Sequence, residues 1–141
     1  LVGIPEDADI VSFENSLECI IRLLNAAVQV PNILIPVATK VLHRKRRFLV
    51  PMLDNILLTY YLNALGRVSD LARTQDKRHA ASVAGIALSG FRDDLAAVGD
   101  EVAVVKDMLA QEGYLLSPVR ILEILIWMAE EPMGYYRSVP S

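Results

Sequence analysis

Hydrophobic residues recur along most of the chain at steps of three and four positions, the spacing of one face of an α-helix. In the first such segment, residues 13–28, the recurring positions are Leu17, Ile20, Ile21, Leu24 and Val28. Ser12 precedes the segment as a candidate N-cap, and Pro31 follows it, where a helix does not easily continue. The pattern therefore predicts a first amphipathic helix over about 13–28.

Two further helices are predicted, separated by a short connector. Pro36 suits the first turn of a second helix that runs to about Arg46. We expect this helix to turn inward the apolar side chains of Val37, Ala38, Val41 and Leu42. After a connector over 48–51, Asp54 is a candidate N-cap for a third helix, which Gly66 ends. The apolar face of this third helix comprises Leu57, Leu58, Tyr61, Leu62 and Leu65.

The second half of the chain predicts three more helices. The first, which Gly85 and Gly90 could interrupt, has the apolar positions Ala80, Val83, Ala84, Ala87 and Leu88. The next ends at Gly113 and has the most regular apolar face, made by Leu95, Val98, Val102, Val105 and Leu109. The last begins at Ser117-Pro118 and ends at Pro132. Its inward positions are Ile121, Leu122, Leu125, Ile126 and Met128.

The expected fold class is all-α, because no segment alternates in the manner of a strand bounded by hairpin turns. A chain of 141 residues with 53% hydrophobic content is large enough to bury one proper core. We therefore expect a compact single-domain bundle of five to seven helices over residues 1–141. Because the chain begins with Leu1 rather than Met, this domain could be a trimmed portion of a longer chain.

Composition and charge narrow the classes of function. The single cysteine, Cys19, excludes an internal disulfide framework and a multi-cysteine metal site. The net charge of −3 gives no overall attraction to nucleic acid or to an anionic membrane, so such binding would need a local patch. Pro31 and Pro36 interrupt the longest uncharged run, 23–39, and argue against a membrane span. The acid-rich N-terminal residues do not resemble a signal peptide, so we expect a cytoplasmic protein that does not contact a membrane.

Several motifs that mark common sites are missing from the sequence. It contains no glycine-rich phosphate loop, no paired-histidine metal motif and no nucleophile elbow. Its two histidines, His43 and His79, have no carboxylate at metal-ligand spacing. We therefore expect neither a bound metal nor a cofactor.

A dense cluster of cations lies within the stretch TKVLHRKRRFLVPMLDN. Five of the fourteen Lys and Arg residues fall between positions 40 and 47 of this acidic chain. On a helix that begins at Pro36, one cationic stripe comprises Lys40, His43, Arg44 and Arg47. Lys45 and Arg46 complete the cluster. Like charges at i, i+4 repel by roughly a few tenths of a kcal/mol per pair, so the cluster needs neutralising acids or a bound anion.

Asp54 follows the cluster across the connector, and two interpretations of its role are open. It could form a structural ion pair with an arginine, or it could belong to a site that binds phosphate or a nucleic-acid backbone. Tyr60, one to two turns later, could reach the same cleft. Arg120 stands between apolar residues and is expected to be the buried partner of an acid, with Asp54 the leading candidate. Trp127, also flanked by apolar residues, is expected in the core.

The same stretch resembles the signature TKxLHRKRPxLIPxxDS of an uncharacterised bacterial family. The later block SPVRILEILIWM resembles the second block of that family. This chain has Arg47 where the family usually has proline, and Asn55 where it usually has serine. The resemblance implies membership of a family without an assigned activity, so it implies no mechanism.

A more remote resemblance is to the helix-hairpin-helix DNA glycosylases. Thr39-Lys40-Val41 followed by Pro51-Met52-Leu53-Asp54 is similar in order and helix context to their lysine-bearing helix and P-x-D turn. The resemblance implies that Lys40 is a catalytic nucleophile and that Asp54 is the catalytic aspartate. The chain departs from those enzymes in having IPVATK where their glycine hairpin stands, and in placing Asp54 one residue further from its proline.

Three hypotheses of function follow. The first is an anion- or nucleic-acid-binding helical module, whose partner is nucleic acid or another phosphate-bearing ligand. The second is an enzyme acting on nucleic acid, a glycosylase or lyase with Asp54 and Lys40 in its active site. The third is a structural or partner-binding protein. The binding residues of the first hypothesis are Lys40, His43, Arg44, Lys45, Arg46, Arg47, Arg120 and Tyr60.

Overall fold

The protein is built from helices, as the sequence predicts. The computed structural model describes residues 4–138, with side chains as far as Glu130. Its helices are α1 Ser16–Ala27, α2 Ile35–Lys45, α3 Asn55–Ala64, the 3₁₀ helix η1 Val68–Gln75, α4 Ala80–Ala97, α5 Gly99–Gln111 and α6 Pro118–Ser138. Residues 4–138 contain no strand, which confirms the all-α prediction. No helix within these residues combines the length and the apolar character that a membrane span requires.

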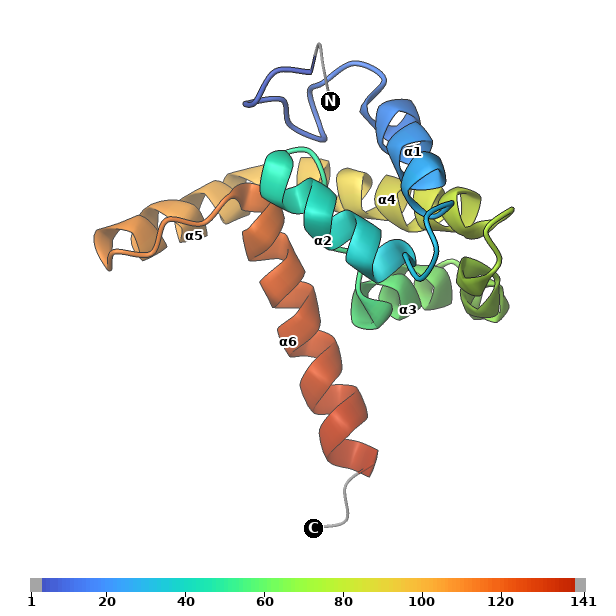
Figure 1. Ribbon diagram of the computed structural model, residues 1–141. Coiled ribbons are helices and arrows are strands. Elements are labelled where there is room, and N and C mark those ends of the chain that lie inside the picture. The colour runs from blue at the N-terminus through green and yellow to red at the C-terminus, as the bar shows by residue number, and fades with distance from the viewer. Residues whose placement is uncertain (1–3, 139–141) are drawn as a thin grey trace.

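The central element of the bundle is α4, which contacts every other helix of the described chain. Figure 1 shows it crossing the molecule and leading into α5. Gly85 and Gly90 do not interrupt α4, and at each of them a neighbouring side chain packs where a Cβ would stand. A Cβ added at Gly85 would lie 2.7 Å from Cδ1 of Ile21 on α1, and one added at Gly90 would lie 2.6 Å from Cδ1 of Tyr61 on α3.

The predicted inward face of α2 is wrong in part. Val37 and Val41 are 45% and 55% exposed, whereas Ile35, Ala38 and Thr39 are buried. Positions 35, 38, 39 and 42 fit the helical period as well as the predicted set does, but they include a threonine. Thr39 can be buried because its hydroxyl donates to the Ile35 carbonyl at 3.0 Å. Lys40 therefore shares the exposed face of α2 with the two valines.

Three helix boundaries also differ from the prediction. α1 begins at Ser16, because the Ser12 hydroxyl donates to the Asp9 carboxylate instead of capping a helix. The regular apolar face predicted from Leu95 onward is divided, since α4 ends at Ala97 and α5 begins at Gly99. Each of the two helices turns a face to the core, so the apolar period continues across the break. The sequence pattern did not predict η1, whose 3₁₀ geometry has a different period.

α6 differs from the prediction in length and in its buried face. It continues past Pro132, because a proline removes one backbone hydrogen bond and kinks a helix without necessarily ending it. Ile121, Leu122 and Ile126 are buried as predicted, but Leu125 and Met128 are 45% and 57% exposed. Figure 1 shows the reason, since α6 leaves the bundle as it proceeds and only its first turns lie against the other helices.

Candidate functional site

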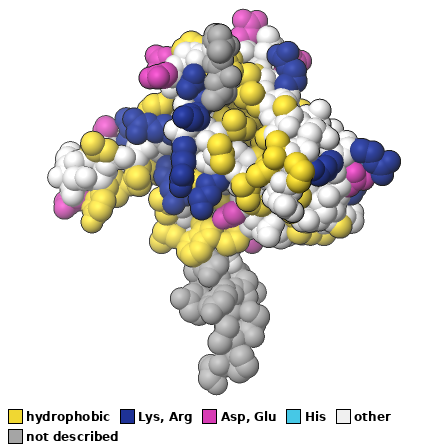
Figure 2. Space-filling model, viewed as in Figure 1, with side chains coloured by type: hydrophobic (Ala, Val, Ile, Leu, Met, Phe, Trp, Pro, Cys, Tyr) yellow, Lys and Arg dark blue, Asp and Glu magenta, His cyan; other side chains and the backbone are white. Residues whose placement is uncertain are grey.

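In the structure, the cationic cluster of residues 40–47 contains both exposed side chains and half-buried side chains that form hydrogen bonds within the protein. Lys40, Arg44, Lys45 and Arg47 are exposed. His43 and Arg46 are half-buried, and the guanidinium of Arg46 donates to the carbonyls of Ile4 at 3.1 Å and Lys45 at 2.7 Å. Figure 2 shows Lys and Arg side chains gathered over the end of α2 and the beginning of α6. The predicted helical stripe thus loses two members, because His43 turns inward and Arg47 lies beyond the end of α2 at Lys45.

His43 turns inward to hold the connector between α2 and α3, which in the structure comprises residues 46–54. Its Nδ1 donates to the Val50 carbonyl at 2.7 Å, and this carbonyl can only accept, so the proton lies on Nδ1. On the next residues of the connector, the Leu53 amide donates to the Thr39 hydroxyl at 2.9 Å. Two side chains of α2 therefore satisfy backbone groups of an irregular segment that has no helical partners of its own.

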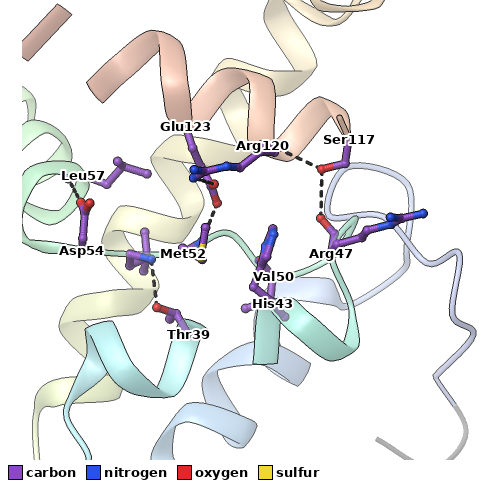
Figure 3. A network of polar contacts seen from close by, with 11 residues as sticks. Thr39, His43, Arg47, Val50, Met52, Asp54, Leu57, Ser117, Arg120 and Glu123 are labelled. Atoms are coloured by element: carbon purple, nitrogen blue, oxygen red, sulfur yellow. Dashed lines mark hydrogen bonds and ion pairs between the residues drawn. The ribbon is translucent and has the colours of Figure 1, made fainter. Parts of the chain in front are cut away.

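The other side of the connector is held by Glu123 of α6, a residue that the sequence analysis missed. Glu123 is 2% exposed, and its carboxylate accepts from the Met52 amide at 2.5 Å and from Nη1 of Arg120 at 3.0 Å. Figure 3 shows the three residues converging between α6 and the connector. The sequence does contain a signal for Glu123, since it is the one charged residue of the apolar run ILEILIW. A carboxylate in such a run is buried only where hydrogen-bond donors or cations accompany it.

Arg120 therefore pairs with Glu123, three residues further along α6, and not with Asp54 as predicted. Residues at i and i+3 lie side by side on a helix. Formation of α6 alone therefore brings Glu123 next to Arg120, whereas Asp54 belongs to another element. The backbone amide of Arg120 donates to the Ser117 hydroxyl at 3.1 Å, and that hydroxyl donates to the Arg47 carbonyl at 3.4 Å. The beginning of α6 thus contacts the connector at Arg47 through Ser117, in addition to the contact of Glu123 with Met52.

Asp54 caps α3, as the sequence predicts. One carboxylate oxygen, Oδ1, accepts from the Leu57 amide at 2.9 Å. Among the residues that the structure describes, Asp54 forms no ion pair. The other oxygen, Oδ2, accepts no hydrogen bond from these residues, so it can accept one from a ligand.

A pocket of about 610 Å³ lies where α2, the connector, α3 and α6 meet. Its apolar lining comprises Pro36, Val37, Met52, Leu57, Ile124 and Trp127. Its charged lining comprises Lys40, Asp54, Arg120 and Glu123. The volume falls in the range of about 300–1,000 Å³ that is typical of small-molecule sites. The structure thus brings together the two candidate catalytic residues, Lys40 and Asp54, with Arg120.

Two predicted aromatic positions differ from the expectation. Tyr60 is not among the residues that line the pocket, because its ring packs edge-on against Tyr61 with centroids 4.9 Å apart. Trp127 was expected in the core, but it is 41% exposed and lines the pocket. Its spacing was informative, since positions 120, 123, 124 and 127 share one face of a helix. That face of α6 is the wall of the pocket.

Burial raises the pKa of Glu123 above its ordinary value. The hydrogen bonds from the Met52 amide and Arg120, together with the charge of His43, oppose this rise without cancelling it. A carboxyl whose pKa is higher in the folded than in the unfolded chain binds more protons when folded. Its stabilising contribution is complete below the ordinary value of 4.5 and is lost as the pH rises through the raised pKa.

We predict that this loss is visible in the pH dependence of stability. The free energy of unfolding of Glu123→Gln, measured in urea, should improve relative to wild type as the pH rises from 4.5, because the amide stays neutral. Glu112→Gln, at an exposed position, is the control, and its difference from wild type should not follow the same trend. If the difference in the free energy of unfolding between wild type and Glu123→Gln stayed constant across this pH range, the raised pKa of Glu123 would be contradicted.

The described residues contain no group of three or more His, Cys, Asp or Glu side chains placed to hold a metal ion. No curated protein and no solved structure matches the chain. One family model does match, over residues 1–130, and this family has no assigned function. The expectation of an uncharacterised family is therefore confirmed, and the chain belongs to the family of unknown function DUF6308.

Proposed function

We propose that the pocket binds a phosphate-bearing ligand of the nucleotide class. The observation that carries this proposal is the meeting of an exposed indole, Trp127, with two cations, Lys40 and Arg120, in one pocket of about 610 Å³. A flat base stacks on an aromatic face, and a phosphate binds Lys or Arg through charge-assisted hydrogen bonds. The pocket offers both kinds of contact within the size of one nucleotide.

The two cations contribute differently to phosphate binding. Lys40 is exposed and forms no ion pair with another described residue, so its full charge is available. Arg120 uses Nη1 for Glu123, but a guanidinium has five donors, and its side chain is 42% exposed. The buried carboxylate of Glu123 thus orients Arg120 toward the pocket while part of the guanidinium stays free for a ligand.

The remaining contacts favour a base over a bare phosphate. Met52, Leu57 and Ile124 provide an apolar wall next to Trp127, and removal of the ring surface from water is favourable at about 25 cal/mol per Å². Asp54 Oδ2 would accept a hydrogen bond from a ring N–H or an exocyclic amine. Asp54 would repel a second phosphate, so the site fits a ligand with its charge at one end.

Trp127 is the single tryptophan of the chain, so its fluorescence reports occupancy of the pocket directly. We predict that thymidine monophosphate quenches this fluorescence saturably and that thymidine binds more weakly. Lys40→Gln should weaken nucleotide binding about tenfold, the equivalent of one charge-assisted hydrogen bond. The matched control is Lys45→Gln, an exposed lysine of the same helix that does not line the pocket.

Absence of a saturable change in Trp127 fluorescence with millimolar nucleotide would refute the proposal. The same conclusion would follow if Lys45→Gln weakened binding as much as Lys40→Gln, since the charge would then act from anywhere on the surface.

A second candidate is an enzyme that acts on an abasic site in nucleic acid. One observation favours it: Lys40 and Asp54 line the same pocket, as the resemblance to the DNA glycosylases implies. In this chemistry the amine of Lys40 adds to the aldehyde carbon C1′ of the ring-opened sugar, and the resulting carbinolamine loses water to form an imine. Asp54 would act as the acid-base partner of the amine.

Borohydride trapping tests this candidate, because it reduces the imine to a stable amine. If Lys40 is the nucleophile, DNA with an abasic site should be trapped covalently by wild type and by Lys45→Gln, but not by Lys40→Gln. Trapping that persists in Lys40→Gln would assign the adduct to other lysines, and no trapping by wild type would eliminate the enzyme.

A further inference from the structure

A second pocket lies on the other side of the first turn of α6. It has a volume of about 270 Å³, and its lining includes Arg47, Phe48, Lys106, Asp107, Tyr114 and Ser117. Ser117 belongs to this pocket, whereas Arg120, which donates its backbone amide to the Ser117 hydroxyl, belongs to the first pocket. The two pockets are therefore neighbours, separated by the start of one helix.

The chemistry of the second pocket repeats that of the first. Tyr114 is 63% exposed, and the guanidinium carbon of Arg47 lies 5.1 Å from the centroid of the Phe48 ring. Arg47 and Lys106 form no ion pair with other described residues. Asp107 is an acid in the same lining, so the cations outnumber it. Exposed aromatic surface and cations again occur together, and here both cations are unpaired among the described residues.

Exposed cations connect the two pockets. Lys40 lines the first, Arg47 lines the second, and Arg44 lies between them in sequence and is exposed. Helix α2 rises about 7.5 Å over the five residues from Lys40 to its end at Lys45, which matches about two nucleotides of a stacked strand at about 3.4 Å each. Figure 2 shows a group of Lys and Arg side chains close together over the end of α2, while other Lys and Arg side chains lie apart from it on the right of the view.

We propose that the ligand is a single-stranded nucleic acid that occupies both pockets, with one base against Trp127 and another against Tyr114. This inference rests on the proposed function of the first pocket and adds a second subsite and the polymer. Bases paired in a duplex do not present their faces, so stacking on two separate aromatic side chains requires a single strand. Arg44 and Arg47 contact the phosphates between the two bases.

The dependence of affinity on strand length tests the second subsite, again through Trp127 fluorescence. Thymidine tetranucleotide should bind at least about five- to tenfold more tightly than the mononucleotide, since one stacked base contributes about 1–3 kcal/mol. A uridine tetranucleotide distinguishes RNA from DNA, and tighter binding of either one than of its mononucleotide supports the proposal. A duplex of the same length should bind more weakly than the single strand.

Variants of the second pocket separate it from the first. Tyr114→Ala should weaken tetranucleotide binding at least about fivefold and leave mononucleotide binding unchanged. Arg47→Gln should lower the slope of log affinity against log salt by about 0.7, the value of one phosphate contact on a single strand. Arg22→Gln on α1, which lines neither pocket, is the matched control and should change neither quantity. All three positions lie on the surface, and thermal melting verifies that each variant folds.

The outcomes distinguish failure of this inference from failure of the proposed function. If the mononucleotide quenches Trp127 but the tetranucleotide binds no more tightly, the first pocket is a nucleotide site and the second subsite is refuted. A length dependence that survives Tyr114→Ala and Arg47→Gln, or a duplex that binds as tightly as the single strand, would also refute it. If neither ligand changes the fluorescence, both proposals fail.

Discussion

The hydrogen bond from the Met52 amide to the buried carboxylate of Glu123 determines how the rest of the site is arranged. It attaches the connector that follows α2 to α6, a helix more than sixty residues later in the chain. The first pocket exists because these two segments are held together, since Met52 and Glu123 both line it. The same carboxylate fixes Arg120, so one group positions both the wall of the pocket and one of its cations.

Burial of the Glu123 carboxylate is energetically unfavourable, which suggests that the protein retains it for a function. A carboxylate that is 2% exposed loses most of its hydration, and the loss is offset only because a backbone amide and a guanidinium donate to it. An apolar residue at position 123 would avoid the penalty but would leave the Met52 amide without its acceptor and Arg120 without its partner. The buried charge therefore contributes specificity of position more than stability, which is what a binding pocket requires.

The sequence predicts the local features of the site and includes Arg120 of α6 among its residues, but it misses Glu123 and assigns Trp127 to the core. Asp54 as the cap of α3, and Lys40 on a neighbouring helix, follow from N-cap chemistry and from a short connector. Glu123 and Trp127 were missed because their neighbours are apolar, and a helical period cannot distinguish a face packed in the core from a face that lines a pocket. The inward face of α2 was misassigned for a related reason, since a buried Thr39 needs the Leu53 amide, a partner from another element.

Hydrogen exchange at the Met52 amide tests the central claim most directly, because this amide belongs to no helix and owes its protection to Glu123 alone. In the wild-type protein it should exchange as slowly as the Leu53 amide, which Thr39 holds on the opposite side of the connector. In Glu123→Ala the Met52 amide should become fast while the amides of α4 stay protected. Exchange of the wild-type Met52 amide at the rate of an unprotected backbone amide would contradict the account.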